Sequence, residues 1–216
     1  MSAPSDQRDR MDGVGEEPVD PSGIACGGWD NSDCTGTPLC PPRCPRFVDK
    51  EGNRFLIRPI VEGDRERLAE TYSAFGTADR AQGIPPADER RRHEWIDQLC
   101  TEGRNVVAEA EDGRLLGHAV YTPSDAPVPE LAVFVHPDHH GRGLGTELCR
   151  HVIAEAAESG REQLSLYVEA TNRAAITVYR RLGFEVVDRG IEIRMELPLD
   201  EPITMEVREP PARQHA

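Results

Sequence analysis

The chain has 216 residues, of which 38% are hydrophobic and 30% charged, enough for one ordinary hydrophobic core with an appendage. Its 39 acidic residues against 25 Lys and Arg give a formal charge of -14, which argues against binding to DNA or RNA because their phosphates would be repelled. No apolar run has the length that a membrane span needs, and the N-terminus lacks the apolar segment of a secretory signal. We therefore expect a cytoplasmic protein that binds neither nucleic acid nor membrane.

The basic residues are unusual because Lys50 is the only lysine among them. A surface rich in carboxylates and nearly free of lysine is typical of an acidic proteome, in which salt at high concentration screens the self-repulsion. The alternative is functional: an acidic surface that recruits a cationic substrate. Because the acidic residues are spread along the whole chain, we favour the hypothesis of a halophilic source.

Residues 1–50 are rich in Gly, Pro, Ser and Asp and show no helical or strand period, which predicts a disordered tail. This segment carries Cys26, Cys34, Cys40 and Cys44. Four clustered cysteines could hold a structural zinc ion and serve as a metal-dependent docking element for another protein. Their spacing, C-x7-C-x5-C-x3-C, lacks the paired C-x2-C knuckles of most zinc sites, so a flexible tail with reduced thiols is favoured.

Residues 51–198 alternate between strand and helix patterns, which predicts an α/β domain with a mixed sheet. Residues 199–216 contain scattered prolines and are expected to fray. The predicted strands lie at 55–59, 105–110, 114–121, 131–135 and 163–169, with a final strand pair between 183 and 197, and the predicted helices at 64–75, 87–100, 145–158 and 172–182.

A glycine-rich turn runs from His140 to Thr146, between the predicted strand 131–135 and the helix that follows. Alternate glycines let the backbone approach a ligand with its N–H groups, and the helix N-terminus adds donors and a positive dipole end. Such a turn suits a phosphate or pyrophosphate, although a tight turn before a helix is the structural alternative. The Walker motif is excluded because the turn has no lysine, and no register supplies the third glycine of the dinucleotide fingerprint.

The stretch from Val135 to Gly145 resembles the pyrophosphate loop of the GNAT superfamily of N-acetyltransferases, whose pattern is Gln/Arg-x-x-Gly-x-Gly/Ala. His140 stands where the family usually has Gln or Arg. Because histidine can donate a hydrogen bond to a phosphate, we expect an altered affinity rather than a lost site.

A second stretch, with Asn172, Tyr179 and Gly183-Phe184, resembles the superfamily's Asn-x-x-Ala-x-x-x-Tyr…Gly-Phe segment. The resemblance covers residues 54–197. It implies the GNAT fold, a mixed and mostly antiparallel central sheet flanked by helices, and leaves the cysteine-bearing segment unexplained.

The resemblance implies an N-acetyltransferase that moves an acetyl group from acetyl-CoA to a primary amine by direct attack in a ternary complex. The acceptor is a protein lysine, an N-terminus or a small-molecule amine, the chemistry needs no metal, and the enzyme is expected as a monomer or homodimer. The alternative is a non-catalytic module that binds acyl-CoA and reports its level without turnover. An intact Tyr179 argues against that alternative.

Two residues are implied as catalytic. Tyr179 matches the tyrosine that protonates the departing thiolate, the alternative being a core tyrosine on an amphipathic helix. Glu130 matches a glutamate that acts as general base through water in several protein-acetylating members, the alternative being a solvated carboxylate at a strand end. Some N-terminal acetyltransferases carry this glutamate on the next strand, where this chain has Tyr167. His118 and His136 are spare candidates, although a lone histidine near a strand end is more often structural.

The cofactor-binding residues follow from the same resemblance. Family strands before the glycine turn splay open and pair through their backbone with the pantetheine amides, and the turn itself holds the pyrophosphate. Asn172 is expected to bind the pantetheine arm or to order the start of its helix. The implied residues are Val133, Phe134, Val135, His140, Gly141, Arg142, Gly143, Leu144, Gly145, Thr146 and Asn172.

Overall fold

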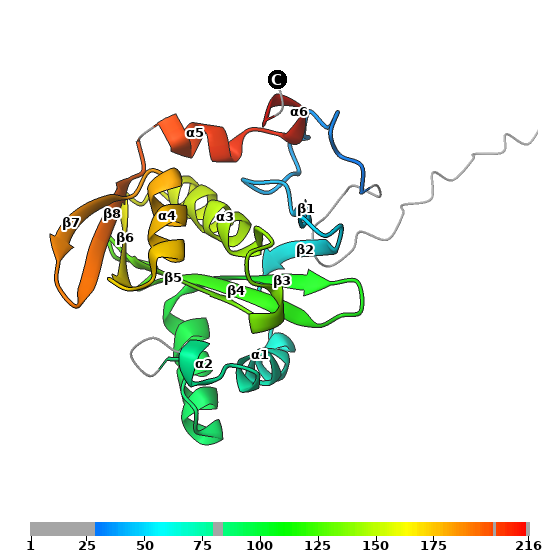
Figure 1. Ribbon diagram of the computed structural model, residues 1–216. Helices are drawn as coiled ribbons and strands as arrows, with labels where there is room; N and C mark the ends of the chain where they lie inside the picture. Colours follow the sequence, from blue (N-terminus) through cyan, green and yellow to red (C-terminus); the bar gives the residue numbers. More distant parts are fainter. Residues whose placement is uncertain (1–28, 80–83, 201, 215–216) are drawn as a thin grey trace, which may run out of the picture.

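A computed structural model of the chain describes residues 29–79, 84–200 and 202–214. Within these residues eight strands form one sheet in the order β1-β2-β3-β4-β5-β6-β8-β7 (Figure 1). Every neighbouring pair is antiparallel except β5 and β6, which are parallel. The predicted mixed, mostly antiparallel sheet is thereby confirmed. The strands are β1 (Arg46–Val48), β2 (Arg54–Pro59), β3 (Arg104–Ala110), β4 (Leu115–Thr122), β5 (Glu130–Val135), β6 (Gln163–Glu169), β7 (Glu185–Arg189) and β8 (Glu192–Pro198).

Helices cover both faces of this sheet. One pair lies below it in Figure 1 and the other pair above. The lower pair is α1 (Asp64–Ser73) and α2 (Glu89–Glu102), and the upper pair is α3 (Leu144–Glu158) and α4 (Arg173–Arg181). Two short 3-10 turns, η1 (Thr77–Asp79) and η2 (Pro137–His139), precede α2 and α3.

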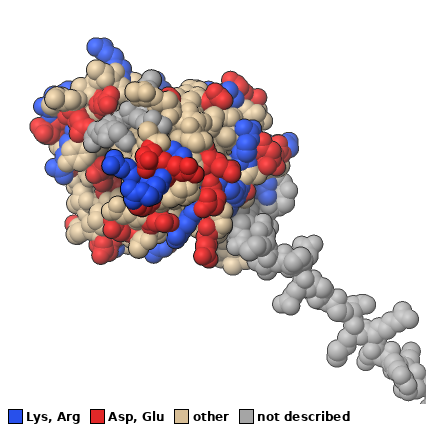
Figure 2. All heavy atoms as spheres, turned by 90° about the horizontal axis from the view of Figure 1, so that it is seen from below, with Lys and Arg blue, Asp and Glu red and all other residues tan. Residues whose placement is uncertain are grey.

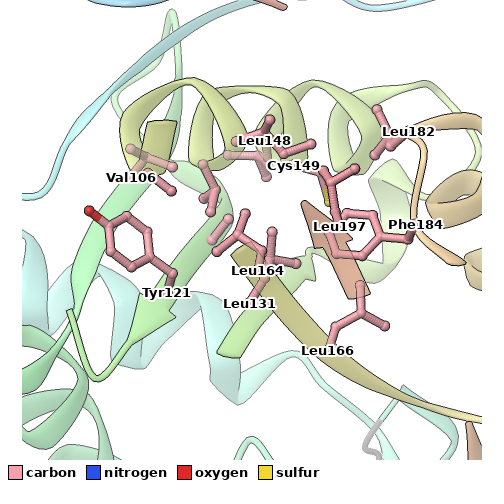
Figure 3. Close-up of a cluster of buried hydrophobic side chains, with 14 of the residues drawn as sticks. Val106, Tyr121, Leu131, Leu148, Cys149, Leu164, Leu166, Leu182, Phe184 and Leu197 are labelled. Carbon is pink, nitrogen blue, oxygen red and sulfur yellow. The ribbon is translucent and has the colours of Figure 1, made fainter. Parts of the chain in front are cut away.

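Alternation along β5 gives each helix pair a core of its own. Leu131, Val133 and Val135 face the larger hydrophobic cluster beneath α3 and α4, whereas Phe134 packs against the smaller cluster formed with α1 and α2. Figure 3 shows the larger cluster, in which Leu148 and Cys149 of α3 lie over the sheet. Because one strand lines both cores, both helix layers fix its position.

The predicted helix and strand ends agree with the structure to within a few residues. α2 is displaced at both ends, because it runs from Glu89 to Glu102 rather than from 87 to 100. Its start is set by Asp88, whose side chain accepts a hydrogen bond from the Arg91 N–H at 2.9 Å, an N-cap that the polar sequence conceals.

The prediction of a disordered tail over residues 1–50 requires correction from residue 29 onward. Arg43 is buried, and its guanidinium donates to Glu147 in α3 and to the Val207 carbonyl at 2.7 Å. The short strand β1 pairs with β2. Because these contacts join residues far apart in the chain, no local hydrophobic periodicity predicts them. Residues 1–28, with Cys26, lie outside the described residues.

The expected fraying after Pro198 also requires correction. Two short helices follow, α5 (Pro202–Arg208) and α6 (Pro211–Gln214), and Val207 is only 2% exposed. Each helix begins with proline, which suits the first helical position because its missing N–H would have no partner there. α5 packs against α3, and α6 lies beside the N-terminal segment, where the Ala212 N–H donates to the Cys34 carbonyl (Figure 1).

Figure 2 views the molecule from the side of α1 and α2, where acidic and basic side chains are interspersed. Exposed ion pairs such as Arg65–Asp97 and Arg90–Glu94 contribute to this pattern. Within the described residues, no helix combines the length and the apolar character that crossing a bilayer requires.

Candidate active site

The parallel strands β5 and β6 pair only at their beginnings. Glu130 and Ser165 are their one pair of register partners, and beyond this point the strands separate. A cleft of about 280 Å³ opens where they part. Its described lining residues are Phe75, Asp79, Ile84, Glu130, Leu131, Ala132, Val133, Phe134, Val135, His140, Tyr167, Val168, Glu169, Asn172, Ala175 and Tyr179. Residues from both family-like stretches, 135–145 and 172–184, thus line the same cleft.

The glycine-rich turn presents backbone donors next to this cleft. Gly141 and Gly143 have φ angles of 76° and 100°, in the left-handed region that favours glycine. Gly143 is the N-cap of α3 and offers no side-chain cap, so the N–H groups of the first helical turn have no acceptor there. Together with the positive end of the helix dipole, these donors fit a phosphate group.

The His140 ring makes a hydrogen bond within the protein. Its Nε2 lies 2.8 Å from the Val135 carbonyl oxygen. Because a carbonyl only accepts, Nε2 carries the proton and donates it to the end of β5. The other nitrogen, Nδ1, can donate to a phosphate only when the ring is a doubly protonated imidazolium. The ring therefore ties the turn to β5, and a phosphate contact by neutral His140 is not available in this geometry.

The Arg142 side chain is likewise engaged within the protein. Its guanidinium pairs with Glu51 at 2.7 Å and donates to the Asp138 carbonyl. What Arg142 offers at the turn is therefore its backbone.

Tyr179 lies on α4 with its ring against the larger core. Its ring meets Phe184 edge-on, with centroids 5.9 Å apart. Burial, and secondarily the nearby Cys149 thiol, raises the pKa of the Tyr179 phenol well above its usual range. The hydroxyl is therefore protonated at neutral pH and available as a donor at the cleft.

Asn172 orders the start of α4, one of the two roles considered for it. Its side chain accepts a hydrogen bond from the Ala175 N–H at 3.0 Å, the geometry of an N-cap. Its amide nitrogen remains a donor at the rim of the cleft.

Glu130 stands at the beginning of β5 and lines the cleft. Partial burial of its carboxyl group, and secondarily the negative charge of Glu192, raises the pKa of Glu130 above its usual value. A carboxylate of raised pKa is a stronger base, which suits a group that accepts a proton at neutral pH.

The two spare histidines do not line the cleft. His118 is fully buried, accepts a hydrogen bond from the Tyr72 hydroxyl and donates to Asn105 at 2.9 Å. Burial lowers the pKa of His118 to about 3, so it is neutral and structural. His136 caps the turn η2 by accepting from the Asp138 N–H.

The structure adds two carboxylates to the lining of the cleft that sequence reasoning missed, Asp79 and Glu169. Asp79 arrives from η1, and Glu169 ends β6, opposite Glu192 of β8. No motif marks these residues, and tertiary structure alone brings them to the cleft, Asp79 from a turn and Glu169 from a strand. Among the described residues, no group of three or more His, Cys, Asp or Glu side chains is arranged to hold a metal ion.

Comparison with known proteins identifies a matching family and several relatives. The family model described as "Acetyltransferase (GNAT) family" matches residues 67–184. A mycothiol acetyltransferase of Mycolicibacterium smegmatis is 41% identical over 148 residues, which cover 66% of this chain and 49% of the relative. The chain thus spans about half the length of the mycothiol acetyltransferases it matches.

Other relatives are matched over most of their length. An L-methionine sulfoximine/L-methionine sulfone acetyltransferase of Pseudomonas aeruginosa is 32% identical over 137 residues, covering 60% of this chain and 80% of the relative. The structure of yncA from Salmonella typhimurium, which contains acetyl-CoA, superposes with a TM-score of 0.56 at 26% identity, over 68% of this chain and 95% of that one.

Proposed function

Because the chain belongs to the GNAT family of acetyltransferases, we propose that it transfers an acetyl group from acetyl-CoA to a primary amine by direct attack. The observation that carries the proposal is the cleft between β5 and β6, which is lined by Tyr179 and Glu130 and lies next to the uncapped N-terminus of α3. The cleft thus combines two candidate proton-transfer groups with the β5 edge, which leads through His140 into the glycine-rich turn.

The residues at the cleft fit acetyl-CoA. The backbone N–H groups from Gly141 to Thr146 and the α3 dipole would hold its pyrophosphate. The edge of β5 that β6 leaves unpaired, from Val133 to Val135, offers backbone groups to the pantetheine amides. The thioester would supply an activated acetyl group, and residues of the protein are assigned the proton transfers.

Glu130 is assigned the first proton transfer. A primary amine with an ordinary pKa near 10.4 is almost entirely ammonium at neutral pH, and only the neutral form attacks. Glu130 accepts the ammonium proton through an intervening water, and its raised pKa makes it a better acceptor than an ordinary carboxylate.

Tyr179 is assigned the stabilisation and protonation of the departing thiolate. Because its pKa lies well above that of a thiol, about 8.5, complete proton transfer from an isolated phenol to a thiolate would be uphill. Tyr179 therefore acts first as a hydrogen-bond donor that stabilises the negative charge developing on sulfur. As the C–S bond breaks, the phenol proton passes to sulfur and is replaced by the proton that the attacking nitrogen loses as the amide forms.

The acceptor is assigned from the charge of the cleft. The described residues that line it include three carboxylates, Asp79, Glu130 and Glu169, and neither lysine nor arginine. An amino-acid acceptor would bring its own carboxylate into this negative field. The lining therefore favours a cationic amine without a free carboxylate, unlike the substrates named for the Pseudomonas aeruginosa relative.

Release of free CoA thiol tests the proposal, with a polyamine, a lysine-rich peptide, methionine and glutamate as acceptors. We expect turnover with the first two and little with the amino acids. Tyr179→Phe should lower kcat by a factor of about 100 or more, the usual contribution of a general acid. The matched control is Tyr121→Phe, because the buried Tyr121 hydroxyl has no partner among the described residues and lies outside the cleft.

Tight CoA binding without turnover on any acceptor would instead support the acyl-CoA sensor. Absence of CoA binding would defeat both functions. A preference for amino acids would leave acetyl transfer standing and overturn the assignment of the acceptor.

A further inference from the structure

The hairpin between β1 and β2 packs against the glycine-rich turn. The Lys50 N–H donates to the Arg142 carbonyl at 3.2 Å, and Glu51 pairs with the Arg142 guanidinium at 2.7 Å. A Cβ placed on Gly143 would lie 3.6 Å from the Phe47 ring. This hairpin lies outside residues 67–184, which the family model matches, so the contact is a feature of this chain beyond the matched segment.

Hydrogen bonds within the hairpin fix the position of its tip. The Asp49 carboxylate accepts from the backbone N–H groups of Glu51 and Asn53, both at 2.9 Å, and from the Asn53 side chain. Asp49 is only 6% exposed, and Gly52 supplies the left-handed residue of the turn at φ 87°. The backbone of Lys50 is therefore held against the glycine-rich turn by a preformed structure.

The glycine-rich turn has no free cationic side chain of its own. Arg142 is occupied by Glu51 and the Asp138 carbonyl, and the Nε2 of His140 is occupied by the Val135 carbonyl. No cationic side chain of the turn is therefore left to neutralise a phosphate bound here. Because the negative charges of Glu51 and a bound phosphate repel each other, a cation from a neighbouring element would stabilise the bound phosphate.

Lys50 is the one lysine of the chain, and it is exposed to solvent. A lysine ammonium has three hydrogen-bond donors and sits at the end of a flexible four-carbon side chain. It can therefore reach a phosphate that binds close to the Lys50 backbone. We propose that the Lys50 ammonium binds a phosphate group of CoA, either its pyrophosphate or its 3′-phosphate. This assignment rests on the proposed function, because it requires CoA at the glycine-rich turn.

Calorimetric titration with CoA and with 3′-dephospho-CoA tests the assignment on four proteins: wild type, Lys50→Gln, Lys50→Arg and Arg90→Gln. Lys50→Gln should weaken CoA binding about tenfold, the size expected for one charge-assisted hydrogen bond, and its affinity should depend less on salt. Lys50→Arg should restore most of the affinity. Arg90→Gln removes an exposed cation from α2 and should leave CoA affinity unchanged.

The second ligand identifies the phosphate. A loss confined to CoA assigns Lys50 to the 3′-phosphate, whereas an equal loss with both ligands assigns it to the pyrophosphate. Wild-type affinity of Lys50→Gln for both ligands overturns the inference alone. Failure of the wild-type protein to bind either ligand overturns the proposed function and this inference with it.

Discussion

Arg43 and Glu147 form a buried, two-bonded ion pair. The Nε and Nη2 atoms of the guanidinium donate to the two carboxylate oxygens at 2.6 and 3.0 Å, and both side chains are less than one-tenth exposed. Glu147 belongs to the first turn of α3, the helix whose N-terminus forms the candidate phosphate site. The pair therefore links the N-terminal segment directly to the element on which binding depends.

Arg43→Met should lower the free energy of unfolding by about 3–5 kcal/mol, because it removes both short hydrogen bonds to the buried Glu147 carboxylate and leaves it only the longer contact with Arg150 at 3.5 Å. Urea denaturation measures this loss. The control is Arg65→Met in the exposed pair Arg65–Asp97, whose side chains are 44% and 58% exposed, and should cost under about 1 kcal/mol.

The double variant Arg43→Met/Glu147→Met removes both charges and should recover much of the stability. Equal costs for Arg43→Met and Arg65→Met would show that the buried pair does not hold the N-terminal segment on α3.

The parts of the fold that the sequence foretold are those with long local periods. Strands and helices between residues 55 and 197 carry alternating or helical apolar patterns, and the structure confirms them. Residues 29–50 and 202–214 show no local period, and the sequence therefore predicts irregular structure there. Their order comes instead from contacts with distant residues. Arg43 and Glu147 are 104 residues apart, and a three-residue strand such as β1 is too short for a period to appear.

The candidate site divides in the same way. Motif residues such as Tyr179, Asn172 and the alternate glycines are recognisable because their spacing reflects one local element. Glu192 and Glu169 escape recognition because only the pairing of β6 with β8 brings them together near Glu130. The engagement of His140 with the Val135 carbonyl was also hidden, since a sequence does not show which acceptor a side chain meets.

Two buried histidines should make the fold sensitive to mild acid. Burial lowers the pKa of His118 to about 3 and that of His151 to about 4, whereas both are near 6.5 in an unfolded chain. Between these values the unfolded state binds protons that the native state does not, so stability falls as pH falls below about 6.5. Each histidine should contribute a slope of about 1.4 kcal/mol per pH unit.

Unfolding free energies measured between pH 7 and pH 4.5 give this slope. His118→Gln should reduce the slope by about 1.4 kcal/mol per pH unit even if it lowers stability at every pH. An unchanged slope in this variant would mean that His118 titrates alike in the folded and unfolded chains.

Glu192 should tune the proposed base. Its negative charge helps to raise the pKa of Glu130, so Glu192→Gln should lower that pKa. The acid limb of the kcat/KM profile would then move to lower pH, because Glu130 stays ionised further into acid. Glu130→Gln should remove this limb and lower kcat/KM by about 100-fold. Glu185→Gln on the exposed edge strand β7 serves as the control for a lost carboxylate.

If the acid limb keeps its position in Glu192→Gln and moves instead with another variant, Glu130 is not the group that titrates in it.

Two glycines separate backbone strain from ligand binding. Gly141 in the glycine-rich turn and Gly160 after α3 have φ angles of 76° and 72°, and a Cβ on either would meet nothing within 4 Å. Replacing either by alanine therefore adds the same left-handed strain, about 1–2 kcal/mol of unfolding free energy, without a steric clash. Only Gly141→Ala, however, places a methyl group where the backbone is proposed to approach the pyrophosphate.

Gly141→Ala should therefore weaken CoA binding about tenfold or more, while Gly160→Ala loses comparable stability and keeps wild-type affinity. Thermal unfolding and CoA titration on the same two variants separate the two effects. Equal affinities would place the pyrophosphate away from Gly141. A loss of affinity in both variants would trace the effect to general destabilisation, because Gly160 lies at the opposite end of α3 from the N-terminal donors.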